Sequence, residues 1–236
     1  MQSDQGSSAP GDARYFIRPM KDEDIPQVLN IDHEAFATQW PPLSYGSLKQ
    51  ELRNRMAHYI VLCTRPSPAE EVTHSVPPAT TQAPVNGLWH QIRAIFQRNH
   101  QASAVATISP SLLDTVIGFA GIWKMMDEAH LISIAVKAGH RGQGCGEMLL
   151  IAVIQMAIEL GARVVTLEVR VSNRVAQALY VKYGLRTAGV RHGYYSDNNE
   201  DALIMTTDSI VTDEFRAYFK KLREAHAKKW KDLYQA

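Results

Sequence analysis

The stretch HRGQGCGEMLL, residues 140–150, places three glycines within five positions and then becomes apolar. Glycine loses more conformational entropy on folding than other residues, so this cluster indicates a loop whose backbone must approach another group closely. The preceding residues, HLISIAV (130–136), have the composition of a strand, and the following EMLLIAVIQMAIEL (147–160) has the length and propensity of a helix, which Gly161 ends. A glycine loop at a helix N-terminus offers free amides to an anion such as phosphate.

The composition is that of a globular chain that can bury a core. Its 236 residues are 45% hydrophobic, and 25 Lys and Arg balance 24 Asp and Glu to a formal net charge of +1. This balance argues against general electrostatic attraction to nucleic acid or membrane, and no export signal or run of about 18 apolar residues is present. The two cysteines, Cys63 and Cys145, lack a metal-ligand pattern. We therefore expect a cytoplasmic protein with no membrane partner, no direct nucleic-acid binding and no metal.

The order of predicted strands and helices indicates a mixed α/β domain. We expect residues 1–14 to be a disordered tail, 15–207 to form the domain and 208–236 to form an amphipathic helix. A 64–114 insertion interrupts the domain; residues 65–86 are of low complexity, and 87–98 have a helical apolar spacing. The patterns predict strands at 15–20, 58–63, 115–126, 130–136, 163–169, 185–195 and 200–207, and helices at 22–36, 45–54, 147–160 and 172–184.

The glycine loop lacks the residues of two common phosphate motifs. It has no lysine and hydroxyl pair as in GxxxxGK[ST], and its glycine spacing is not that of a dinucleotide fingerprint. Instead, Arg141, Gly144 and Gly146 form R-x-x-G-x-G, which resembles the acyl-CoA pyrophosphate loop of the GNAT superfamily of N-acetyltransferases. Taken alone, the same glycines would also fit a turn that only lets a helix and a strand pack closely.

The resemblance extends along much of the chain and points to the RimI-like, ribosomal-protein-alanine branch of that superfamily. It spans about 15–63 and 115–207 and leaves out the tail, the insertion and the C-terminal helix. The segments that carry it are AFATQWPPLSYGSLKQEL (35–52), GFAGIWKMMDEAHLISIAV (118–136), LEVRVSNRVAQALYVKYGL (167–185) and RHGYYSDNNEDALIM (191–205).

The fold that the resemblance implies is the GNAT fold. It has a mixed central β-sheet flanked by helices, in which two central parallel strands, here 130–136 and 163–169, splay apart. An extended ligand can then pair with the main-chain groups left exposed between the strands.

Acetyl-CoA is the co-substrate that the resemblance implies. The splayed strand matches the residues that pair with the pantetheine arm, and the loop matches those that wrap the pyrophosphate. Asn173, also a helix N-cap candidate, matches a cofactor contact. Cys145 has no adjacent base, so we interpret it as a small loop residue and not as a nucleophile. The residues assigned to acetyl-CoA are Ile134, Ala135, Val136, Arg141, Gly142, Gln143, Gly144, Cys145, Gly146, Glu147 and Asn173.

Transfer of an acetyl group to an amine needs a neutral amine, a polarised thioester and a proton for the departing thiolate. The resemblance assigns Glu168 as the general base and Tyr180 as the general acid. From the residues alone, Glu168 would equally fit an outward strand carboxylate, and Tyr180 a helix residue with a packed ring and a solvated hydroxyl. No serine or cysteine lies in a nucleophile motif, so we expect direct transfer without an acyl-enzyme.

The resemblance implies a protein N-terminal α-amine as the acceptor, by analogy the N-terminal alanine of a small-subunit ribosomal protein. An α-amine has a reference pKa of about 7.7–8.0 against about 10.4 for lysine, so more of it is neutral at pH 7. Lysine, another N-terminus or a small amine stays open as an alternative. The residues that match the acceptor side are Tyr194, Tyr195, Glu200 and Asp201, of which the two acids would equally fit as ordinary hairpin residues.

A second alternative is a catalytically silent module that contacts ribosomal RNA. Its contact surface would be the basic C-terminal helix, which carries Lys220, Lys221, Arg223, Lys228, Lys229 and Lys231. That helix also contains acids, so the same pattern fits the solvated face of a packing helix.

Overall fold

A computed structural model describes residues 15–36, 43–64 and 114–234. The predicted tail at 1–14 and the 65–86 and 87–98 parts of the insertion lie outside the described residues. Within the described ones, no helix is both long and apolar enough to cross a membrane.

Seven strands form one mixed sheet in the order β1-β2-β3-β4-β5-β7-β6. Of the neighbouring pairs in this sheet, β4 and β5 run parallel and the others are antiparallel. The mixed sheet confirms the predicted fold class. The strands are β1 (Tyr15–Pro19), β2 (Ala57–Thr64), β3 (Thr115–Met125), β4 (Glu128–Val136), β5 (Val164–Arg170), β6 (Leu185–Tyr195) and β7 (Glu200–Thr207).

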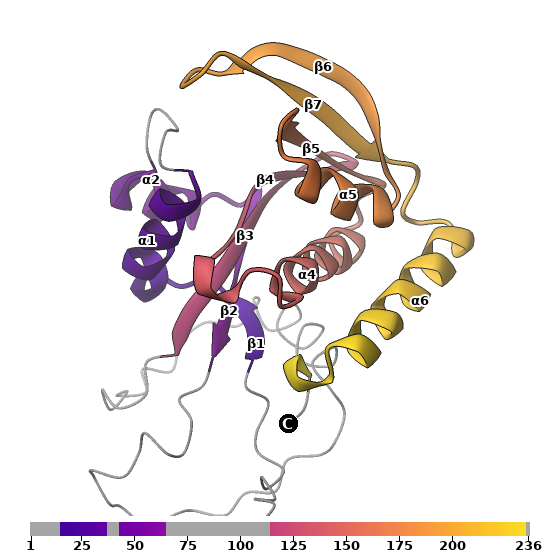
Figure 1. Cartoon of the computed structure of the whole chain (residues 1–236), viewed down its shortest axis with the longest axis horizontal. Coiled ribbons are helices and arrows are strands. Elements are labelled where there is room, and N and C mark those ends of the chain that lie inside the picture. Colours follow the sequence, from indigo (N-terminus) through magenta and orange to yellow (C-terminus); the bar gives the residue numbers. More distant parts are fainter. Residues whose placement is uncertain (1–14, 37–42, 65–113, 235–236) are drawn as a thin grey trace, which may run out of the picture.

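Helices cover both faces of the sheet (Figure 1). One face carries α1 (Ile25–Ala35), which follows the short turn η1 (Asp22–Asp24), and α2 (Tyr45–Glu51). The other face carries α4 (Cys145–Glu159) and α5 (Arg174–Lys182). The long α6 (Asp213–Lys229) packs outside α4 and is followed by the turn η4 (Lys231–Leu233).

Helix α4 is apolar around most of its circumference, and ten of its fifteen residues are buried. A helix of this kind must be covered on more than one side, because an exposed apolar face would lose the free energy of burial. The sheet covers one side of α4 and α6 covers another, with Phe219 of α6 buried in the same core. The core of the protein therefore requires the C-terminal helix, which the resemblance to the superfamily does not include.

The structure differs from the prediction at two element boundaries. The turn between β3 and β4 is formed by Met126 and Asp127, so β4 begins at Glu128 and the hairpin is tighter than predicted. Helix α6 ends at Lys229 instead of continuing to residue 236, because Trp230 leaves the helical conformation with φ −116° and ψ 54°. The predicted helix over 208–236 is therefore shorter in the structure, which has it at Asp213–Lys229.

The predicted splay is present between β4 and β5. The two strands pair from Glu128 with Val164 to Leu131 with Leu167. Beyond that point β4 stays paired with β3 as far as Val136, and β5 stays paired with β7 as far as Arg170. The sheet therefore opens into a fork whose two inner edges begin at Ile132 and Glu168.

Candidate active site

Glu168 lies at the point where the fork opens. Its side chain is 8% exposed, and its two oxygens contact two basic groups: Oε2 lies 2.6 Å from Nε2 of His130, and Oε1 lies 3.1 Å from Nη2 of Arg191. His130 is in register with Thr166, and Thr166 and Glu168 point to the same face of β5, which explains why the two side chains meet. The structure thus brings a buried carboxylate to the inner edge of the fork.

Tyr180 projects from α5 and is 6% exposed. Burial raises the pKa of its phenol, and the nearby Tyr195 raises it further. A phenol with a raised pKa keeps its proton at neutral pH, so its hydroxyl is present as a hydrogen-bond donor. This is the protonation state that a general acid needs.

Tyr194 and Tyr195 lie edge to face at the end of β6, with ring centroids 5.1 Å apart. The guanidinium of Arg170 stacks on the Tyr195 ring at 3.8 Å, and that of Arg191 lies 5.4 Å from the centre of the Tyr194 ring. Glu168 acts electrostatically on both phenols, and burial raises the pKa of Tyr195 to about 12. The two predicted aromatic residues therefore stand beside Glu168.

The predicted acids Glu200 and Asp201 hold the β6–β7 hairpin together. Glu200 accepts a hydrogen bond of 2.7 Å from the Ser172 amide and pairs with Arg170, and the Ser172 contact holds its pKa at about 2. Asp201 accepts from the Gly193 amide at 2.9 Å and contacts His192. These contacts explain both acids as hairpin residues, and contact with a substrate stays a prediction.

The glycine loop has the unusual backbone conformation that its glycines indicated. Gly142 and Gly144 have φ of +72° and +82°, in the left-handed region that residues with a Cβ adopt at a cost. The loop leads into α4, whose first amides, at Cys145, Gly146 and Glu147, have no partner within the helix. Gly142 is exposed, and Gly144 and Gly146 are half-buried, so an anion can reach these amides.

The side chains of the loop have structural contacts of their own. Arg141 donates from Nε to the Val136 carbonyl at 2.9 Å, and its half-exposed guanidinium lies 3.6 Å from Glu34. Gln143 donates to the Gly139 carbonyl at 3.0 Å. The positive charge predicted from Arg141 is therefore partly engaged in closing the turn, and the backbone amides remain the main anion-binding groups.

Three further predicted residues have defined environments. Cys145 is fully buried, and burial raises the pKa of its thiol to about 11, which agrees with a packing role and not with a nucleophile. Asn173 caps α5 by accepting from the Ala176 amide at 3.2 Å. Glu147 accepts from Lys182 and from the Tyr183 hydroxyl at 2.7 Å; burial opposes its ionisation, but these bonds outweigh burial and lower its pKa.

Sequence reasoning missed four residues at this site. His130 and Arg191 contact Glu168, whereas His226 and Trp230 contact the loop at Gly144. His130 and Glu168 are 38 positions apart, and His226 and Gly144 are 82 apart. The alternation of side chains between the two faces of β4 and β5 could have indicated that His130 lies near Glu168, but no local pattern marks the other three residues.

Comparison with known proteins agrees with this arrangement. The pattern described as the acetyltransferase (GNAT) family matches residues 69–185. A relative from Bacillus subtilis (strain 168), named as a putative [ribosomal protein bS18]-alanine N-acetyltransferase, is 33% identical over 189 residues, which cover 80% of this chain and 92% of the relative. The chain belongs to the GNAT family of acetyltransferases. The enzyme accordingly takes its acetyl group from acetyl-CoA.

Solved structures support the GNAT fold. The crystal structure of the Escherichia coli ribosomal-protein-S18-alanine N-acetyltransferase aligns with a TM-score of 0.55 and 24% identity, covering 84% of this chain and 95% of that one. The PaiA N-acetyltransferase from Thermoplasma acidophilum, determined in complex with coenzyme A, aligns with a TM-score of 0.51 and 15% identity over 82% and 98% of the two chains.

Acetyl-CoA fits the residues that this GNAT enzyme presents. Within the part of the chain that the structure describes, the fork leaves one edge of β4 without a strand partner from Ile132 to Val136. This edge includes the predicted Ile134 and Ala135, and an extended arm with amide groups can pair there. The free amides of the α4 N-terminus lie just beyond that edge, where a diphosphate would follow the arm. Among residues 15–36, 43–64 and 114–234, no group of three or more His, Cys, Asp and Glu is placed to hold a metal ion.

Replacing His130 by phenylalanine should lower kcat by about tenfold, because Glu168 loses a charge-assisted hydrogen bond worth roughly 1.5–3 kcal/mol and with it a fixed orientation. The Kd of acetyl-CoA should stay at the wild-type value, since His130 lies before the fork. Steady-state kinetics and calorimetry measure the two quantities. An unchanged kcat would show that the contact does not orient Glu168.

The buried imidazole of His226 should make the free energy of unfolding depend on pH. His226 is 2% exposed, and burial lowers its pKa below the ordinary value of 6.5, although the nearby Glu147 opposes the shift. Because the folded state disfavours the protonated imidazole, the free energy of unfolding is highest above pH 6.5 and falls as the pH drops toward the folded-state pKa of His226. Urea unfolding of wild type and His226→Gln should therefore show a steeper loss for wild type between pH 7.5 and pH 5. Parallel losses would contradict the buried neutral imidazole.

Proposed function

We propose that this GNAT enzyme acetylates a protein N-terminal α-amine, with the N-terminal alanine of the ribosomal protein bS18 as its acceptor. The observation that carries the proposal is the position of Glu168, a buried carboxylate at the opening of the fork with a phenolic acid, Tyr180, on the neighbouring helix. The name of the Bacillus subtilis relative supports the choice of acceptor. A ribosomal protein as acceptor places the reaction in the cytoplasm.

The chemical step needs one base and one acid from the chain. Acetyl-CoA supplies a thioester whose carbonyl carbon is attacked by the acceptor nitrogen. Glu168 takes the proton of that nitrogen, directly or through a water, as the N–C bond forms. Tyr180 gives its proton to the sulfur as the C–S bond breaks, and an amide N–H at the end of β4, near Val136, stabilises negative charge on the carbonyl oxygen. Transfer is direct, which agrees with the buried Cys145 thiol.

The surroundings of Glu168 favour a small cationic acceptor group. Arg191, which is 51% exposed on the β6–β7 hairpin, holds a cation against the carboxylate. An arriving ammonium competes with Arg191 for the same oxygen, beside the rings of Tyr194 and Tyr195. An α-amine loses its proton about two to three pH units more easily than lysine, so one partly paired carboxylate is an adequate base. This combination supports an N-terminus over a lysine side chain.

The acceptor can be identified with a series of peptides. We expect acetyl-CoA to label the α-amine of a peptide with the first residues of bS18, with the highest kcat/KM when alanine is first and a lower value when another residue replaces it. An α-blocked peptide with an internal lysine is the control. Mass spectrometry locates the acetyl group, and a product acetylated on lysine alone would exclude the proposed acceptor while leaving the acetyltransferase activity intact.

Substitution of the two catalytic candidates tests their roles. Glu168→Gln should lower kcat by about 10²- to 10⁴-fold, the usual contribution of a general base, and Tyr180→Phe should also lower it. Both should keep the wild-type Kd of acetyl-CoA, because neither side chain lies at the diphosphate amides. Glu224→Gln, which removes a 64% exposed carboxylate on α6, is the matched control. Equal, severe loss of acetyl-CoA binding in Glu168→Gln and Tyr180→Phe would overturn these assignments.

A further inference from the structure

The ring of Trp230 lies directly against the glycine loop. A Cβ added to Gly144 would lie 2.8 Å from three atoms of this ring, so the loop and the ring fit together only because residue 144 has no side chain. Gly144 also has a φ of +82°, and it is the N-cap of α4. The residue that sets the direction of the first α4 amides is therefore packed against the C-terminal end of the chain.

His226 contacts the same glycine through a second kind of interaction. Its Nε2 lies 3.1 Å from the Gly144 carbonyl oxygen, and its Nδ1 lies 2.6 Å from the Tyr234 hydroxyl. Because a carbonyl can only accept, Nε2 carries the proton and donates it to Gly144, while the neutral ring accepts from Tyr234 at Nδ1. Three side chains, His226, Trp230 and Tyr234, thus form one connected group around Gly144.

The His226 contact does not use the free amides of the loop. In a helix the carbonyl groups point toward the C-terminus and the amides toward the N-terminus. The Gly144 carbonyl, which His226 contacts, also accepts from the Met148 amide at 2.9 Å as the first bond of α4. His226 therefore approaches the flank of the first turn, and the amide ends of Cys145 and Gly146 face away from its contact.

The other half of α6 contacts the helix that carries Tyr180. The Tyr218 hydroxyl donates to the Lys182 carbonyl at 2.8 Å, and Phe219 lies edge to face with Tyr183 at 6.3 Å. Tyr183 and Lys182 in turn donate to Glu147 in the first turn of α4. The C-terminal segment thus contacts both the end of α5 and the start of α4.

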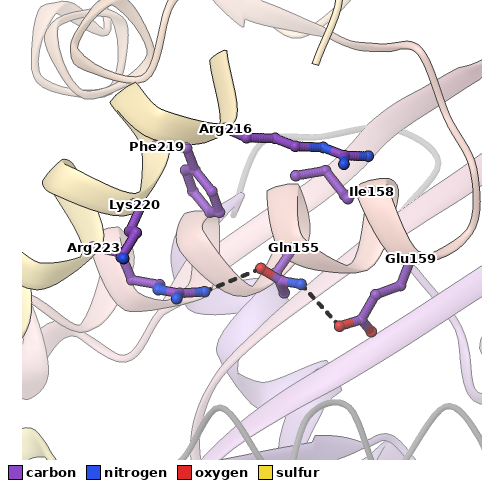
Figure 2. Close-up of a pocket in the computed structure, with 7 residues that line it drawn as sticks. All are labelled: Gln155, Ile158, Glu159, Arg216, Phe219, Lys220 and Arg223. Atoms are coloured by element: carbon purple, nitrogen blue, oxygen red, sulfur yellow. Dashed lines mark hydrogen bonds between the residues drawn. The ribbon is translucent and has the colours of Figure 1, made fainter. Parts of the chain in front are cut away.

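Between these ends, a side-chain hydrogen bond and apolar packing connect α6 to α4. Arg223 donates from Nη1 to Gln155 at 3.2 Å, and Gln155 donates to Glu159 at 2.9 Å (Figure 2). Phe219 points into the same interface, beside a pocket of about 390 Å³ that Arg216 and Lys220 also line. This pocket lies along α4 past the glycine loop, so it belongs to the packing of α6 and leaves the loop contacts unaffected.

We propose that the C-terminal segment of residues 212–234, here called the C-terminal brace, positions the acetyl-CoA site of this enzyme through three of its side chains. His226, Trp230 and Tyr234 are positioning residues that hold Gly144, and hence the diphosphate amides, in the geometry for binding. The proposal rests on the assignment of the glycine loop to the diphosphate. A loop with left-handed glycines has many conformations when free, so holding it in advance removes an ordering cost from binding and raises affinity.

A necessary consequence is that acetyl-CoA and the brace stabilise each other. If docking of the brace raises the affinity for acetyl-CoA by some factor, bound acetyl-CoA must favour docking of the brace by the same factor. This reciprocity separates a positioning role from a merely structural one, because a helix that only completes the core would gain no more from the ligand than the rest of the fold does.

Calorimetric titration of the full chain with acetyl-CoA tests the proposal. Trp230→Ala should raise the Kd about tenfold, the factor that corresponds to ordering roughly one more backbone residue on binding. Trp230→Phe should restore most of the affinity, because it keeps a ring against Gly144. Lys221→Ala, an exposed change on the same helix, should bind like wild type. The KM of the acceptor peptide should be unchanged in all three, since the brace does not contact the Glu168 side of the fork.

Hydrogen exchange on the wild-type chain provides a second measurement that does not depend on a variant folding. Acetyl-CoA should slow amide exchange in residues 212–234 and in the loop by a larger factor than in the rest of the core. Wild-type affinity in folded Trp230→Ala, or exchange in 212–234 that acetyl-CoA slows no more than in the rest of the core, would overturn the proposal.

A charge placed in the loop distinguishes failure of the brace from failure of the loop assignment. Gln143→Glu adds a negative charge at an exposed loop position and should weaken acetyl-CoA binding if the loop holds the diphosphate. If Gln143→Glu weakens binding and Trp230→Ala does not, the brace proposal alone is wrong. If Gln143→Glu binds like wild type, the loop assignment is wrong.

Discussion

The structure depends on the separation of β4 from β5. Their parallel pairing ends at Leu131 and Leu167, yet each strand is still held by an antiparallel neighbour on its outer side, so the two cannot close again. Main-chain amides and carbonyls that are left inside a fold without partners are costly, and an extended ligand with its own amides can satisfy them. The opening of the sheet therefore creates an unpaired edge and also brings Glu168 to the mouth of the fork.

The charges around the fork divide into two groups with different functions. Arg170, Glu200 and their partners in the hairpin turn hold β6 and β7 in place, and they are engaged with one another. Glu168, His130 and Arg191 lie at the fork itself, with Glu168 nearly buried. The two basic groups each contact a different oxygen of this carboxylate, so its side chain has a fixed orientation at the fork. The hairpin acids thus build the scaffold, and Glu168 carries the proposed chemistry.

The packing of the C-terminal segment on α4 is explained by the apolar composition of α4. Because α4 is apolar on nearly all sides, covering it with the sheet alone would leave apolar surface in water, and α6 removes that surface. Once α6 runs along α4 toward its N-terminus, its end reaches the glycine loop, where Trp230 and His226 contact Gly144. The need to cover the core thereby places aromatic and histidine side chains next to the loop that is proposed to receive the diphosphate.

The sequence by itself determined the elements and the local chemistry of the loop. Glycines at 142 and 144 indicate positive φ because other residues adopt it at a cost, and strand and helix patterns around them place free amides at a helix start. Glu168, Tyr180 and the tyrosines at 194 and 195 were found through resemblance to a family, because their spacing alone also fits a packed ring or an outward carboxylate. Only the folded structure shows that Arg191 meets Glu168, that Glu200 and Asp201 hold the hairpin, and that the last helix ends at Lys229. Contacts of this kind join residues that are far apart in the chain, and their partners are set by strand register and helix packing, which no local pattern of residues records.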